Sequence, residues 1–253
     1  MGRVTVEHNA AVVHEPDLPG NQGRLVLAML AVEHKHPVGR DEIADELWPD
    51  QLPRSWETAL RAVISKVRSC LAGAGLTPDL IVNAFGCYQL RLDSGWPDPG
   101  WLDLEAASES LHSAETQLAQ GDAAAAAVSA TLTCLICSRP FLRGIYSPWT
   151  LRQRDRIAAM HVEARECLAE AHASAGEFAL SARAAESGLM LDPYRDTLYQ
   201  RLIRSRALSG DRMAAASVYA RYRDLMIREL GVQPTPETVA AFRESVIEPV
   251  SGA

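Results

Sequence analysis

The sequence predicts a mainly α-helical protein in which a small α+β domain is followed by an all-α domain. Three observations predict this. Short β-branched runs occur among helical patterns only in the first part of the chain, and the later part is almost wholly helical and alanine-rich. Between them, residues 94–100 (SGWPDPG) gather turn-forming residues. A chain of 253 residues has room for two domains, which we place at residues 1–94 and 101–248.

The N-terminal domain begins with two short branched runs, Val4–Val6 and Ala11–Val13, which predict a small sheet. The leucine-rich run Arg24–Val32 is too long for such a strand and indicates a buried helix. A second helix is predicted over Arg40–Trp48 and is stopped by Pro49.

A third helix is predicted to open at Ser55, a favoured N-cap residue, with Glu57 in its first turn. It continues to Leu71. Two apolar strands are expected after it, at Leu80–Val82 and Tyr88–Leu92, joined through a turn at Gly86.

The third helix has two faces. At 100° per residue its apolar side chains form one arc that must face a core: Leu60, Ile64, Val67 and Leu71, with Val63 and Trp56 on the flank. The opposite arc carries small residues at its centre, Ala62, Ser65 and Ser69, between Arg61 and Lys66. Small residues let a helix approach base edges, and long cations reach phosphates or guanine. An ordinary solvated helix face has the same composition, so this arc alone does not distinguish a DNA-binding face from a solvated one.

The order of elements favours the first interpretation. Sheet, helix, helix, loop, cationic helix and hairpin is the order of a winged helix-turn-helix, in which the third helix reads DNA. Arg68 lies at the edge of the apolar arc, where its head group is expected to reach the DNA backbone. The predicted DNA-binding residues are Arg54, Ser55, Thr58, Arg61, Ala62, Ser65, Lys66, Arg68 and Asn83.

The second half predicts helices over residues 104–119, 123–137, 151–175, 177–191, 196–208, 212–230 and 236–246. Three of the breaks between them pair glycine with an acid: Gly121-Asp122, Gly176-Glu177 and Gly210-Asp211. The last two breaks are 34 residues apart, which is the tetratricopeptide period, whereas the first interval is 55 residues. We therefore expect an irregular tetratricopeptide-like array.

Several stretches resemble known families. Residues 41–48 (DEIADELW), 60–68 (LRAVISKVR) and 86–90 (GCYQL) resemble the OmpR/PhoB-type winged helix. Residues 102–105 (LDLE), 118–122 (LAQGD), 139–142 (RPFL), 191–196 (LDPYRD) and 228–237 (RELGVQPTPE) resemble the bacterial transcriptional activation domain. Together the chain resembles the Streptomyces antibiotic regulatory protein (SARP) family. The family wing usually carries a basic residue near its tip, but here Asn83, Ala84 and Phe85 stand there, so we expect the wing to contribute little.

The resemblance implies a transcriptional activator that binds direct repeats beside a promoter, and the sequence, with no apparent membrane span or signal peptide, leads us to expect a cytoplasmic location. It also implies contact with RNA polymerase through the loop before the third helix: Pro49, Asp50, Gln51, Leu52 and Pro53.

Charge is unevenly distributed. The net charge is −7, yet residues 54–91 carry five basic and two acidic residues, so that segment is +3 and the rest is −10. Such a chain would dock one basic face on DNA and would not coat it. About four phosphate contacts imply a salt slope near −4, which is modest for a specific regulator. We therefore expect a homodimer, at least on double-stranded DNA.

Other functions find less support. The sequence has no GxSxG, P-loop, HExxH or GxGxxG motif, so an enzyme is not expected, and no cofactor is predicted. Cys134 and Cys137 form a CxxC in an apolar run and are expected to be buried thiols; His34 and His36 are expected in a surface turn. No apolar run of membrane-spanning length and no signal peptide are apparent.

One alternative function remains open, a helical-repeat scaffold or sensor with vestigial DNA binding. Its candidate groove residues are Tyr194, Tyr199, Tyr219 and Tyr222, which are otherwise core. Its candidate anion site is a group of arginines (Arg201, Arg204, Arg206, Arg212), which we expect instead to pair with Asp192, Asp196 and Asp211.

Overall fold

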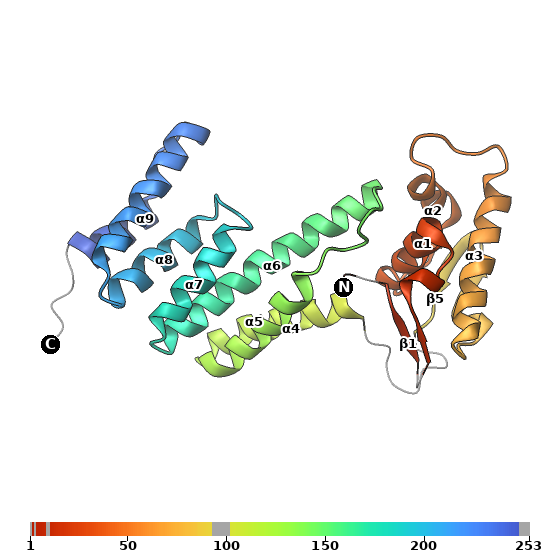
Figure 1. Ribbon diagram of the computed structural model, residues 1–253, viewed down its shortest axis with the longest axis horizontal. Helices are drawn as coiled ribbons and strands as arrows, with labels where there is room; N and C mark the ends of the chain where they lie inside the picture. Colours follow the sequence, from red (N-terminus) through yellow and green to blue (C-terminus); the bar gives the residue numbers. More distant parts are fainter. Residues whose placement is uncertain (1, 3, 9–10, 93–101, 248–253) are drawn as a thin grey trace. The chain divides into compact units, whose positions relative to one another are not determined.

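The computed structural model describes residues 2, 4–8, 11–92 and 102–247 (Figure 1). It divides into two compact units, each with its own packing. The first unit comprises Met1–Ala106 and Arg139–Ile157, and the second comprises Ala107–Ser138 and Ala158–Ala253. This division differs from the ranges expected from sequence, because residues 139–157 pack with the first unit. The expected boundary at residues 94–101 lies outside the described residues.

The first unit has the predicted winged helix order. Its elements are β1 (Val6–His8), β2 (Ala11–Val13), α1 (Gly20–Val32), β3 (Val38–Gly39), α2 (Arg40–Leu47), α3 (Trp56–Gly73), β4 (Ile81–Ala84) and β5 (Cys87–Leu90), with short 3₁₀ turns at Glu15–Asp17 and Pro78–Leu80. The first strand begins at Val6, two residues later than predicted, and its register pairs Val6 with Val13.

A three-stranded antiparallel sheet closes the first unit, in the order β3-β5-β4. The strand β3 was not predicted: it has two residues, of which Val38 pairs with Tyr88 and Gly39 with Cys87. So short a strand carries no alternation of its own, and only its pairing with β5 defines it. In the β4–β5 hairpin, Ile81 pairs with Leu90 and Ala84 with Cys87.

The core of the first unit lies between its three helices and this sheet. From α1 it takes Val26, Met29 and Leu30, all with no exposed surface, and from α2 it takes Ile43. Residues 139–157 add Leu142, Ile145 and Trp149 to the same cluster. The first unit is therefore built from two stretches of chain far apart in sequence.

The described residues of the second unit form helices joined by short turns and loops, with no strand among them. The helices that supply it are α4 (Asp103–Ala119), α5 (Ala123–Cys137), α6 (Pro148–Ser174), α7 (Phe178–Leu189), α8 (Asp196–Leu208), α9 (Arg212–Leu225) and α10 (Pro236–Phe242). The first turns of α4 and α6 belong to the first unit. Single π turns extend α9 through Met226–Leu230 and α10 through Arg243–Ile247. Helices α7, α8 and α9 pack in sequence order, and α8 also packs on α10, as Figure 1 shows.

The Gly-acid pairs end one helix and begin the next, as predicted. Gly121, Gly176 and Gly210 have φ of 79°, 75° and 90°, the left-handed conformation that stops a helix. Asp122 then caps α5 by accepting the Ala125 N–H at 3.0 Å, and Asp211 caps α9 by accepting the Ala214 N–H at 2.9 Å. Local chemistry therefore sets where these helices begin.

Candidate nucleic-acid interface

The helix α3 begins where the sequence places it. Ser55 is the N-cap residue, and its carbonyl accepts the N–H groups of Thr58 and Ala59, both at 3.1 Å. Its hydroxyl makes no capping hydrogen bond. The N-terminus of α3 is therefore not capped by a side chain, and the exposed Arg54, Ser55 and Thr58 lie around it. The free N–H groups and the helix dipole favour an anion at such a position.

The two faces of α3 are those predicted from its periodicity. Leu60, Val63, Ile64, Val67 and Leu71 are buried, at 8% exposure or less. The opposite face is exposed along its length: Arg61, Ala62, Ser65, Lys66 and Ser69. Burial of the apolar arc against α1 and α2 thus fixes which side chains the helix presents to solvent.

The cations of α3 differ in how they are held. Arg61 pairs with Glu57 one turn earlier at 3.2 Å, and both side chains are more than half exposed, so the pair contributes little to stability. Lys66 is exposed. Arg68 is half-buried, and its Nη2 donates to the Ile81 carbonyl at 2.6 Å. Arg68, predicted to contact the DNA backbone, therefore also joins α3 to β4.

The wing, which we define as the β4–β5 hairpin Ile81–Leu90, is tied to α2 as well. The Arg40 N–H donates to the Gly86 carbonyl at 3.1 Å. The Arg40 guanidinium donates to the Asn83 side-chain oxygen at 2.9 Å and lies 5.7 Å from the centre of the Tyr88 ring. Asn83, predicted to contact DNA, is thus engaged by Arg40. Arg40 itself was missed, because only this pairing brings the first residue of α2 to the wing.

The loop between α2 and α3 is exposed. Pro49, Asp50, Gln51 and Leu52 are exposed, and Pro53 is half-buried. Leu52 stands out because it is apolar and 45% exposed. The residues expected to contact RNA polymerase are therefore accessible.

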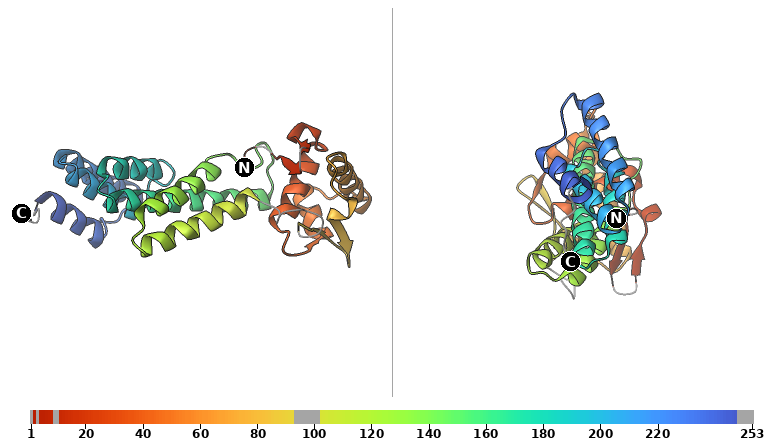
Figure 2. Two further views of the ribbon diagram at one scale, coloured as in Figure 1. Left: turned by 90° about the horizontal axis from the view of Figure 1, so that it is seen from below. Right: turned by 90° about the vertical axis from the view of Figure 1, so that its left-hand side faces the viewer.

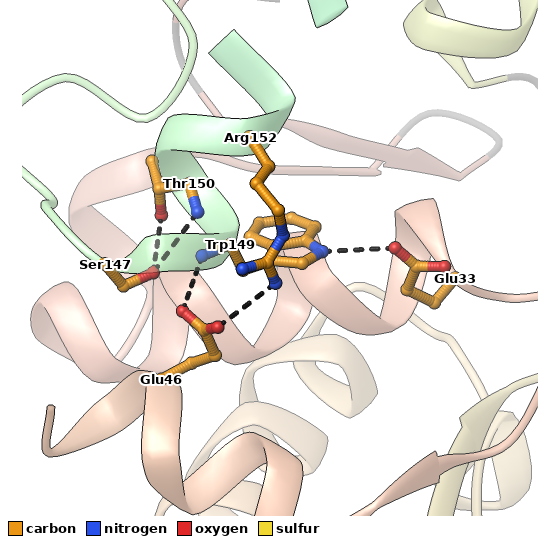
Figure 3. Close-up of polar contacts among 6 residues, drawn as sticks. All are labelled: Glu33, Glu46, Ser147, Trp149, Thr150 and Arg152. Carbon is orange, nitrogen blue, oxygen red and sulfur yellow. Dashed lines mark hydrogen bonds and ion pairs between the residues drawn. The ribbon is translucent and has the colours of Figure 1, made fainter. Parts of the chain in front are cut away.

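A buried carboxylate in α2 holds the start of α6 (Figure 3). Glu46 is 8% exposed; its Oε2 accepts the Trp149 N–H at 2.7 Å, and its Oε1 accepts from Arg152 at 3.3 Å. The Trp149 indole N–H donates to Glu33 at the end of α1 at 3.1 Å. Ser147 caps the same helix end by accepting the Thr150 N–H at 3.3 Å. Two helices of the first unit thereby hold one tryptophan.

In the described residues, no group of three or more His, Cys, Asp or Glu side chains could hold a metal ion. Cys134 and Cys137 are buried free thiols, as predicted, and burial raises the pKa of the Cys137 thiol to about 11. His34 lies in a turn and its Nδ1 lies 2.9 Å from the Ala31 carbonyl. No described helix is both long and apolar enough to cross a bilayer.

The arginines of α8 are paired, but with other acids than predicted. Arg201 pairs with Glu170, Arg204 with Glu244 at 4.0 Å, and Arg206 with Glu186 at 2.5 Å. The expected partners Asp192, Asp196 and Asp211 were chosen for nearness in sequence; helix packing brings the glutamates of α6, α7 and the last π turn closer instead.

The four tyrosines divide between core and surface. Tyr222 has no exposed surface and Tyr199 is 8% exposed, with ring centres 4.6 Å apart. Tyr219 stacks on Phe242 at 4.2 Å, and the 43% exposed Tyr194 donates its hydroxyl to Glu229 at 2.5 Å. Tyr199 and Tyr222 are therefore core residues, as expected, Tyr219 is half-buried, and the exposed Tyr194 departs from that expectation.

Comparison with known proteins identifies the family. The family model described as the bacterial transcriptional activator domain matches residues 102–244. The chain belongs to this family. Because that match lies in the helical part and the winged helix precedes it, the resemblance to SARP-type transcriptional regulators is confirmed.

Curated relatives are also regulators. The chain is 28% identical to the transcriptional regulatory protein EmbR of Mycobacterium tuberculosis over 88% of its own length and 57% of that protein. It is 27% identical to the regulatory protein AfsR of Streptomyces coelicolor over 85% of its length and 21% of that protein. The chain thus spans little more than half of EmbR and about a fifth of AfsR.

The fold matches a solved structure. M. tuberculosis EmbR in complex with a low-affinity phosphopeptide superposes with a TM-score of 0.84 at 21% identity, over 97% of this chain and 65% of that one. The predicted fold class, a winged helix-turn-helix followed by a tetratricopeptide-like helical domain, is confirmed.

Proposed function

We propose that this protein is a sequence-specific DNA-binding transcriptional activator whose helix α3 enters the major groove. The observation that carries the proposal is the exposed face of α3, in which Ala62 and Ser65 lie between the margins formed by Arg61 and Lys66. A narrow centre lets the helix backbone approach base edges. Cations at the margins reach phosphates on either side of the groove.

The contacts in this proposal follow from how each side chain is held. Arg61 exchanges its weak, exposed pairing with Glu57 for guanine or phosphate. The open N-terminus of α3 receives a phosphate beside Arg54, Ser55 and Thr58. Arg68 keeps its hydrogen bond to Ile81 and offers only its remaining N–H groups to the backbone.

Activation is proposed to run through the exposed loop Pro49–Pro53, which would contact RNA polymerase while α3 is on DNA. Two features support this. The loop adjoins the DNA-reading helix, and Leu52 exposes an apolar side chain of the kind that anchors protein contacts. The partners of the proposal are therefore double-stranded DNA and RNA polymerase holoenzyme.

The test of DNA reading is the double variant Arg61→Ala with Lys66→Ala. We expect it to bind a duplex selected by the wild-type chain at least about tenfold more weakly, since a base-reading arginine is worth about 1–3 kcal/mol. The salt slope should fall by about one for each phosphate that the variant no longer binds. Fluorescence anisotropy at several salt concentrations measures both quantities.

The control is Arg143→Ala with Arg156→Ala, which removes the same charge from exposed positions outside α3 and the wing. Its affinity and salt slope should stay close to those of the wild type. Equal losses in both double variants would mean that net charge, and not the face of α3, determines binding.

We propose further that two protomers bind adjacent direct repeats. A single winged helix module buries only about 600–1,000 Å² on DNA and carries few phosphate contacts here. Sedimentation of complexes should give two chains on a two-repeat duplex and far weaker binding to one repeat. A single protomer that saturates a one-repeat duplex at low nanomolar concentration would contradict the paired arrangement.

A further inference from the structure

The apex of the wing combines an exposed aromatic ring with an unusual backbone. Phe85 has a fully exposed side chain. Phe85 and Gly86 form a two-residue loop with φ of 51° and 78°. Such loops suit the twist of a hairpin and favour Asn-Gly or Asp-Gly. A phenylalanine rarely adopts this left-handed conformation, because its Cβ crowds the backbone. The fold therefore gains no packing from Phe85 and carries its backbone strain.

The hairpin that carries Phe85 is held firmly against the helices of the first unit. The Arg68–Ile81 hydrogen bond joins its base to α3, and the two hydrogen bonds from Arg40 join its tip to α2. In Figure 2 the gold hairpin projects from the helical body of this unit. The ring of Phe85 is thus carried at a set position relative to the exposed face of α3, which reduces the entropy cost of binding.

The surroundings of Phe85 fit DNA better than a protein. The wing contains no acidic residue, although the whole chain has a net charge of −7, and the Arg40 guanidinium lies against Asn83 and Tyr88. Among the described residues of the wing, Phe85 is the one large apolar side chain that is exposed, beside the exposed Asn83 and Ala84. Protein-binding surfaces need a contiguous apolar patch. Insertion between base pairs needs one apolar side chain on a rigid support.

We propose that Phe85 is a DNA wedge. With α3 in the major groove, the ring enters the neighbouring minor groove and partly unstacks one base step. This inference rests on the function proposed above. Insertion of the apolar Phe85 ring then takes the place of the charged contact that the wing of this family usually makes. Steps that unstack easily, TA and CA/TG, are then preferred at the wing position, even without hydrogen bonds to their bases.

The deciding variant is Phe85→Asn, which creates the loop sequence most favoured for this hairpin. We expect it to raise the Tm of the free protein and to weaken binding to a selected duplex about tenfold, the scale of one base stacked on an aromatic ring. The salt slope should not change, since no charge is removed. A duplex with 2-aminopurine at the wing step should brighten on binding the wild type and not on binding the variant.

Two further variants separate insertion from other roles. Phe85→Leu keeps an apolar wedge and should retain most of the affinity and the 2-aminopurine signal. Lys66→Ala should lower the salt slope and leave the signal intact. Unchanged affinity and unchanged 2-aminopurine signal in Phe85→Asn would overturn the wedge, as would a loss of polymerase binding without loss of DNA binding. If the wild-type chain selects no duplex at all, the proposed function itself fails. That result differs from failure of the wedge alone, in which the wild type still binds a selected duplex.

Discussion

Trp149→Ala is expected to lower the free energy of unfolding by about 3–5 kcal/mol, the range for truncating a buried tryptophan. Trp149 is 3% exposed in the core of the first unit, and its ring centre lies 5.8 Å from that of Phe141. Truncation would leave a cavity and would also remove the indole that donates to Glu33. Denaturant unfolding followed by circular dichroism measures the loss. DNA affinity should fall at temperatures where the first unit then begins to unfold.

The control for Trp149→Ala is Leu151→Ala, two residues further along α6. Leu151 is 49% exposed, so its truncation should change stability by less than about 1 kcal/mol. Trp149→Phe keeps a ring in the core and should lie between the two. If Trp149→Ala were as stable as Leu151→Ala, residues 139–157 would not belong to the core of the first unit.

The features that sequence predicted well are those whose cause is local. The apolar arc of α3 follows from its 3.6-residue period: its four positions from Leu60 to Leu71 are buried, as is Val63 on its flank, while Trp56 is half-buried. The helix starts after Gly121 and Gly210 follow from a left-handed glycine and a capping aspartate. Such patterns arise within a few neighbouring residues and do not depend on the rest of the chain.

The features that sequence missed depend on contacts between distant residues. In the α2 pattern nothing distinguishes the buried Glu46 from the exposed Asp45. Glu46 is buried against the start of α6, where it accepts the Trp149 N–H, and the sequence gives no sign of this contact because the two residues are 103 positions apart. Arg68 has the pattern of a phosphate-binding residue, but the carbonyl of Ile81 lies within reach of its guanidinium. At Phe85 the sequence indicates only the absence of a basic residue, and the structure adds its exposure and its strained backbone.

Asp196→Asn is the second change with a large expected effect. The Asp196 carboxylate, at the start of α8, accepts four hydrogen bonds. Its Oδ1 accepts from the hydroxyls of Tyr222 and of Thr238, the latter at 2.7 Å. Its Oδ2 accepts from Thr235 at 2.6 Å and from the Gln200 amide at 2.9 Å. Asparagine has one acceptor oxygen and would turn its amide N–H groups toward two of these donors. We expect Asp196→Asn to lower the free energy of unfolding by about 2–3 kcal/mol.

The loss should depend on pH in a defined direction. Burial alone raises the pKa of Asp196, but the hydrogen bonds from Thr235, Tyr222, Thr238 and Gln200 outweigh it, so the pKa lies below the ordinary 3.8. A depressed folded pKa gives stability that is complete above the unfolded pKa and is lost as the pH falls through the folded value. The gap between wild type and Asp196→Asn should therefore be full at pH 7 and shrink below about pH 4.

The matched control is Asp155→Asn, an exposed aspartate of α6. This variant should stay within about 0.5 kcal/mol of the wild-type free energy of unfolding at pH 7 and also below about pH 4. A constant gap for Asp196→Asn across the same range would mean that packing, and not the charged acceptor, holds the site.

The hydrogen bonds of Asp196 also join two of the family-like stretches. Asp196 ends the stretch Leu191–Asp196, and Thr235 lies in the stretch Arg228–Glu237. Thr235 is the N-cap of α10, where it accepts the Thr238 N–H at 3.4 Å while donating to Asp196. One carboxylate therefore fixes the start of α8 to the start of α10. Loss of that link should free α10 first, which hydrogen exchange of α8 and α10 amides in Asp196→Asn would detect as faster exchange in α10.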